Sequence, residues 1–97
     1  MGRNSLRRHR HTVQAVAGMG SRVRLFGSRV DDLARGGDID LLVELDHAVA
    51  QPTIFIARIG ARLQQALGDR RIDVLLAAPN LREEPVHRVA RETGIEL

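Results

Sequence analysis

The chain contains no cysteine, lysine, tryptophan or tyrosine among its 97 residues, and phenylalanine occurs only twice. Without cysteine, disulfides and thiolate metal sites are excluded, which is typical of a protein from a reducing compartment. The lack of aromatic rings argues against a reader of single-stranded nucleic acid, so direct nucleic-acid binding is not expected. No apolar run reaches the roughly 20 residues of a membrane span, and the basic start is not followed by a signal-peptide core. These absences predict a cytoplasmic protein that does not enter a membrane.

The positive charge of the chain comes entirely from arginine. Fifteen arginines against twelve acids give a net charge of +3 with neutral histidines, and 43% of the residues are apolar. Six of the arginines fall in the first 24 residues. Such an excess can attract RNA or an acidic partner, but it is also typical of the solvated face of a helix, which we consider the better interpretation. The length suits one domain, residues 1–97, with a single modest core.

Apolar periodicity and turn residues predict an α/β (α+β) fold, a small mixed β-sheet with helices packed against it. The expected elements are a helix at 6–17, strands at 22–26 and 38–45, a helix at 52–67, a strand at 72–77 and a helix at 81–92. The residues expected to face inward are Ile56, Ile59, Leu63 and Leu67 in the helix at 52–67, and Val86, Val89 and Ala90 in the last helix. After Gly94 only a short tail is expected.

Two aspartates at the start of the second strand are the most informative feature. Asp38 and Asp40 are two residues apart, so in a strand both side chains point to the same face. Asp73 is a third acid, set among branched apolar residues in the strand at 72–77, where an isolated charge would be costly to bury. The two strands carry similar sequences and are expected to be neighbours with their aspartates at the same edge. Carboxylates crowded in this way form an all-oxygen site for a divalent cation.

These acids follow a small-residue turn, Gly27–Ser28, at the end of the first strand, with Arg29 next to it. The turn, the D-x-D strand and the later acidic strand, in this order, resemble the nucleotidyltransferase superfamily built around the DNA polymerase β catalytic core. The resemblance covers residues 23–76 and is closest to the minimal nucleotidyltransferase (MNT) proteins. It implies a polymerase β-like nucleotidyltransferase core.

The resemblance also implies a role for each of these residues. The triphosphate of ATP or another nucleoside triphosphate would be held by Gly27 and Ser28, with Arg29 as an electrostatic helper. Two Mg²⁺ ions would be held by Asp38, Asp40 and Asp73, which together form the catalytic and metal-binding set. The implied activity is transfer of a nucleoside monophosphate, AMP from ATP, to a hydroxyl of a protein.

MNT proteins are often encoded beside a helical HEPN partner, which implies a protein adenylyltransferase that acts as the antitoxin of a HEPN/MNT-type toxin–antitoxin pair. Three departures from the family pattern leave an alternative open. Residues 30–32 read Val-Asp-Asp where many members have Ala-Arg-Gly, Gly37 stands where serine is common, and the spacing from the turn to the first acid is one residue short. The alternative is a catalytically weak or inactive module of the same fold that scaffolds or occludes a HEPN partner. Self-association into a homo-oligomer also stays open.

Overall fold

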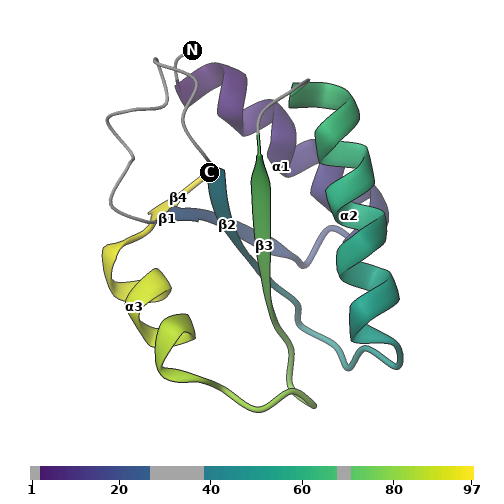
Figure 1. Ribbon diagram of the computed structural model, residues 1–97, viewed down its shortest axis with the longest axis vertical. Helices are drawn as coiled ribbons and strands as arrows, with labels where there is room; N and C mark the ends of the chain where they lie inside the picture. Colours follow the sequence, from purple (N-terminus) through teal and green to yellow (C-terminus); the bar gives the residue numbers. More distant parts are fainter. Residues whose placement is uncertain (1–2, 27–38, 68–70) are drawn as a thin grey trace.

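The computed structural model describes residues 3–26, 39–67 and 71–97, with side chains except for residues 3–9 and 67. Its helices are α1 (Arg3–Ala17), α2 (Pro52–Leu67) and α3 (Pro85–Thr93), and its strands are β1 (Arg22–Phe26), β2 (Ile39–Glu44), β3 (Ile72–Ala77) and β4 (Ile95–Glu96) (Figure 1). Strands β1 and β3 and helix α2 have the bounds that the sequence predicts. Strand β2 lies within its predicted range, and α1 begins at Arg3 instead of Leu6.

The sheet has the strand order β3-β2-β1-β4 among the described strands. Strand β1 is antiparallel to β2 and to β4, whereas β2 and β3 are parallel. A parallel pair needs a crossover connection, and α2 provides it between β2 and β3. The structure therefore confirms the small mixed sheet with helices packed against it, in agreement with a polymerase β-like nucleotidyltransferase core.

One face of the sheet forms the main core. Along β1 and β2 its residues alternate with residues of the opposite face, as a two-residue period requires, and these are polar except for Phe26 and the buried Leu42. The buried cluster joins these strands to α1 and α2; it contains Val13, Ala17, Val23, Leu25, Ile39, Leu41, Val43, Leu45, Val49, Ile59, Leu63, Leu76 and Leu97. Ile59 and Leu63 of α2 are fully buried, as predicted. Each buried side chain of this size stabilises the fold by about 1.5–3 kcal/mol.

Helix α3 lies on the opposite face of the sheet (Figure 1). The prediction that Val86 and Val89 point inward is wrong, because their exposed fractions are 45% and 53%. The buried residues of α3 are His87 and Ala90, and only Ala90 was expected there. A polar histidine can take an inward position because both of its ring nitrogens are hydrogen-bonded, so its burial leaves no polar atom unpaired.

His87 also explains where α3 begins. Its Nδ1 accepts a hydrogen bond from the backbone N–H of Glu84 at 2.9 Å, and its Nε2 lies 2.9 Å from the carbonyl oxygen of Leu76. Since Nδ1 accepts, Nε2 carries the proton and donates to that carbonyl. The helix therefore begins at Pro85, four residues later than the predicted Leu81, and its first turn is fixed to β3.

The stretch predicted as a tail is a strand. Residues 95 and 96 form β4, which pairs with β1 so that Leu25 faces Ile95 and Arg24 faces Glu96. The backbone N–H of Leu97 then donates to the carbonyl oxygen of Val23 at 2.9 Å. Two residues are too few for an alternating pattern to be seen in the sequence, and this pairing was therefore missed.

Gly94 is the residue at which the chain turns from α3 into β4. A Cβ atom at this position would lie 2.4 Å from the carbonyl oxygen of Ala90 and 3.1 Å from that of Leu25. Because both are backbone atoms, we expect Gly94→Ala to lower the free energy of unfolding by about 1–3 kcal/mol. Thermal unfolding followed by circular dichroism would show this as a melting temperature about 4–8 °C lower per kcal/mol.

Gly60→Ala is the matched control for this change. Gly60 lies inside α2, and a Cβ atom there would meet nothing within 4 Å. Alanine favours a helix interior, so this variant should gain roughly 0.5–1 kcal/mol. Equal stability of the two variants would contradict the role given to the close approach at Gly94.

Candidate functional site

Two of the three predicted acids lie side by side at the start of β2 and β3. Asp40 and Asp73 are direct partners in the parallel register of these strands. Neighbouring strands are about 4.8 Å apart and paired residues point to the same face, so the two carboxylates are neighbours. The pairing is held at this end by a hydrogen bond of 2.9 Å from the N–H of Ile39 to the carbonyl oxygen of Arg71. The expectation that the two aspartates share one edge of the sheet is therefore confirmed.

The aspartates differ in their surroundings. Asp40 is half-buried between strands β1 and β3, and Asp73 on the edge strand is exposed. The carboxylate of Asp73 is 3.8 Å from Nε of Arg71, an ion pair between side chains that are both mostly exposed. Such a pair contributes little to stability and leaves Asp73 open to solvent. The pair of acids is therefore more open to solvent on the side of Asp73.

The end of β1 brings the chain to the same place. Phe26, the last described residue of this strand, is the register partner of Asp40. The predicted phosphate-binding residues Gly27, Ser28 and Arg29 come next in the chain, and they lie outside the described residues, as does Asp38. Their roles stay a prediction.

The donor set fits a hard divalent cation as far as the structure describes it. Asp40 and Asp73 supply carboxylate oxygens, the ligands that Mg²⁺ prefers. Within residues 3–26, 39–67 and 71–97, no group of three or more histidines and acids is placed to hold a metal ion. The third carboxylate of the predicted set belongs to Asp38, and metal binding by the three acids stays a prediction.

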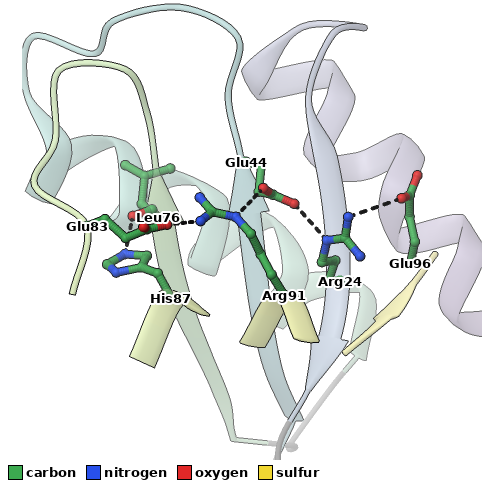
Figure 2. A network of polar contacts seen from close by, with 7 residues as sticks. All are labelled: Arg24, Glu44, Leu76, Glu83, His87, Arg91 and Glu96. Atoms are coloured by element: carbon green, nitrogen blue, oxygen red, sulfur yellow. Dashed lines mark hydrogen bonds and ion pairs between the residues drawn. The ribbon is translucent and has the colours of Figure 1, made fainter. Parts of the chain in front are cut away.

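The same face of the sheet carries an ion-pair network that the sequence analysis missed (Figure 2). Glu44 lies at its centre, four residues after Asp40 on β2. One of its carboxylate oxygens accepts from Nε of Arg24 at 2.8 Å, and the other accepts from Nε of Arg91 at 2.9 Å. The network extends from Arg24 to Glu96 at 3.6 Å and from Arg91 to Glu83. It links β4, β1, β2 and α3.

A partial signal for this network is present in the sequence. Alternation along β1 and β2 places Arg24 and Glu44 on the face opposite the main core. Arg91 comes from α3, and its position depends on how that helix is rotated. A helix predicted with Val86 and Val89 inward would have pointed Arg91 elsewhere.

The network changes the acidity of its central carboxyl. Burial raises the pKa of Glu44, but the hydrogen bonds and positive charges of Arg24 and Arg91 outweigh it, and the pKa lies below its ordinary value of 4.5. The folded state therefore binds this proton less readily than the unfolded state, and the resulting stabilisation is complete at neutral pH. This stabilisation decreases as the pH falls below about 4.5, the ordinary pKa of the unfolded state, and is lost once the pH is below the lowered pKa of the folded state.

Acid unfolding should report this difference. In thermal melts between neutral and acidic pH, we expect the wild type to be more stable than Glu44→Gln at neutral pH and the gap to narrow below the ordinary pKa of 4.5. Glutamine cannot ionise, so this part of the pH dependence is absent from the variant. A gap of constant size across the whole range would contradict the assignment to Glu44.

Two further observations bear on the function of this chain, one on membrane spans and one on its family. Among the described residues, no helix is long and apolar enough to cross a membrane. The family model described as the nucleotidyltransferase domain matches residues 6–93, which include α1 from Leu6 onwards, all of α2 and α3, and the strands of both aspartates. The comparison with curated proteins and the comparison with solved structures each return no match.

Proposed function

Since the chain belongs to the nucleotidyltransferase domain family, we propose that it is a Mg²⁺-dependent transferase that moves AMP from ATP onto a hydroxyl of a protein partner. The observation that supports this best is the pairing of Asp40 with Asp73 on adjoining parallel strands. Carboxylates on paired positions of adjoining strands supply the oxygen ligands that a divalent cation such as Mg²⁺ prefers.

The proposed reaction forms one bond and breaks another. The acceptor oxygen bonds to the α-phosphorus of ATP, the bond from that phosphorus to pyrophosphate breaks, and pyrophosphate leaves. Bound Mg²⁺ would supply charge neutralisation on the phosphates and lower the pKa of the acceptor hydroxyl. Asp38, Asp40 and Asp73 would hold it.

The residues of the chain position the reactants and move the proton. Asp73 is exposed on the edge strand and is the acid that an acceptor hydroxyl can reach, so we assign it the hydroxyl proton. Gly27, Ser28 and the backbone N–H groups of their turn would hold the phosphates, with Arg29 beside them. Asp40 is more enclosed and serves to fix the cation against the nucleotide.

We further propose that the acceptor belongs to a HEPN-family protein and that this chain acts as its antitoxin. This rests on the resemblance to MNT proteins that residues 23–76 carry. A protein partner of this kind would contribute about 800 Å² of its own surface to a stable interface.

The test is a transfer assay with ATP labelled at the α-phosphate, Mg²⁺ and a HEPN-family protein encoded beside this chain. We expect label on the partner, none with ATP labelled at the γ-phosphate, and none after Mg²⁺ is removed with EDTA. Label from the γ-position would mean phosphoryl transfer and overturn the proposal. Complex formation without any label would select the alternative, an inactive module of the same fold that scaffolds or occludes its partner.

A further inference from the structure

Acidic residues are absent from two of the helices of this chain. Helices α1 and α2 contain six of the fifteen arginines and none of the twelve acids. The rest of the chain therefore holds nine arginines against twelve acids. The net charge of +3 is therefore the sum of +6 from helices α1 and α2 and −3 from the rest of the chain.

The two helices form one layer. Both contribute to the core cluster on the same face of the sheet, Val13 and Ala17 from α1 and Ile59 and Leu63 from α2. Figure 1 shows them together on one side of the sheet, with α3 on the other. We call the outer surface of α1 (Arg3–Ala17) and α2 (Pro52–Leu67) the α1–α2 face.

This face is turned away from the candidate site. Ile39 and Leu41 of β2 point towards the helical layer and are buried in the core cluster. Asp40 lies between them in the strand and so points to the opposite side, together with its register partner Asp73. A ligand on the α1–α2 face would leave the aspartates accessible.

Two arginines of α2 show how this face can hold anions. Arg58 and Arg62 are both exposed, one helical turn apart, and neither has an ion pair with another described residue. Residues at this spacing lie about 5–6 Å apart on the same side of a helix. The guanidinium fork binds phosphate oxygens through two parallel hydrogen bonds, which an exposed lysine cannot do.

The size and composition of the face favour a phosphate backbone over a protein. Helices of 15 and 16 residues are about 22–24 Å long at a rise of 1.5 Å per residue, the length of about seven base pairs at 3.4 Å per step along a strand. The other exposed residues of α2 are uncharged; they are Thr53, Ile54, Ala57, Ala61, Gln64, Gln65 and Ala66. None of these residues is an aromatic anchor or carries a charge, so Arg58 and Arg62 are the groups of α2 placed to hold a partner on this face.

We propose that the α1–α2 face binds the phosphate backbone of double-stranded nucleic acid without reading its sequence. The expectation that nucleic acid is not bound rested on missing aromatic rings, which bears on single strands. Contacts to a duplex backbone need cations in one layer and no stacking. The sequence alone does not show that the two acid-free helices pack side by side in one layer.

The experiment compares two double variants that lose the same charge. Binding of a fluorescein-labelled, random-sequence DNA duplex is followed by anisotropy between roughly 50 and 200 mM salt, with a parallel titration of duplex RNA. Arg58→Gln/Arg62→Gln removes two cations from the α1–α2 face. Arg82→Gln/Arg88→Gln removes two exposed cations beside or within α3, on the other face. Circular dichroism checks that both variants are folded.

We expect saturable binding of at least one duplex by the wild type and by the Arg82/Arg88 variant. The Arg58/Arg62 variant should bind about tenfold more weakly at low salt, and the slope of log affinity against log salt should be smaller by about 1.8. Equal weakening of both variants would mean that only total charge matters and would overturn the proposal. So would the absence of binding, a preference for single strands, or displacement of the duplex by polyglutamate as effectively as by unlabelled duplex. No nucleotide or Mg²⁺ is used, so these outcomes are independent of the proposed transfer activity.

Discussion

Asp40→Asn is expected to reduce the rate of nucleotide transfer by about 10³-fold, or about 4 kcal/mol in the activation barrier. The change keeps the size of the side chain and removes the charge that would hold the cation against Asp73. Because Asp40 is half-buried within the register of β1, β2 and β3, an amide should fit without disturbing the strands. Initial rates of label transfer at saturating ATP, measured with equal amounts of folded protein, would check this.

The matched control is Glu92→Gln, which also exchanges an acid for its amide. Glu92 is exposed on α3, so its substitution should leave the rate within about twofold and the stability within about 0.5 kcal/mol. Asp73→Asn should act like Asp40→Asn and, because it would also remove the proton acceptor, should alter the pH profile of the remaining activity. Full activity of both aspartate variants would exclude the paired acids from the reaction.

The second large effect is expected from Glu44→Gln, which should destabilise the fold by about 2–3 kcal/mol. The substitution removes the negative charge between Arg24 and Arg91 and leaves two partly buried cations facing a neutral amide. Losing one partner of such a pair costs more than the pair contributes, because the remaining charge stays desolvated. For a domain of this size the melting temperature should fall by about 8–24 °C.

Glu96→Gln tests whether the position in the network matters. Glu96 is half-exposed and lies 3.6 Å from Arg24, so its loss should cost less than about 1 kcal/mol. Urea unfolding of the two variants gives both free energies under one condition. If Glu96→Gln were as damaging as Glu44→Gln, burial at the centre of the network would not be the cause of the effect.

The fold was predictable where local pattern and burial agree. The strands of the two aspartates and the crossover helix α2 have strong periodicity, and each begins or ends at a glycine, a proline or a change in period. Their order then implied neighbouring strands, and the register of Asp40 with Asp73 confirms it. The family resemblance rested on the same segments, and the family match supports the superfamily.

Helix α3 was not predictable in the same way. The apolar residues Val86 and Val89 predict the buried side of this helix from the sequence. Local propensity gives no reason to predict that a histidine is buried instead. The rotation is set by contacts distant in sequence, from His87 to Leu76 and from Arg91 to Glu44. A buried polar group is tolerated only when its partners are present, and the partners belong to other strands. The polar face of the sheet therefore emerges only from the assembled structure.

Residues 95–97 cover the outer edge of strand β1. Leu97 is 5% exposed within the main core, and its carbonyl oxygen accepts from Arg10 of α1 at 3.2 Å. Strand β4 thus covers the outer edge of β1, a strand that leaves the ribosome about seventy residues earlier. Until residues 95–97 have been synthesised, that edge presents open backbone groups on which another chain could pair. Protection against aggregation is therefore acquired only at the end of translation of this segment.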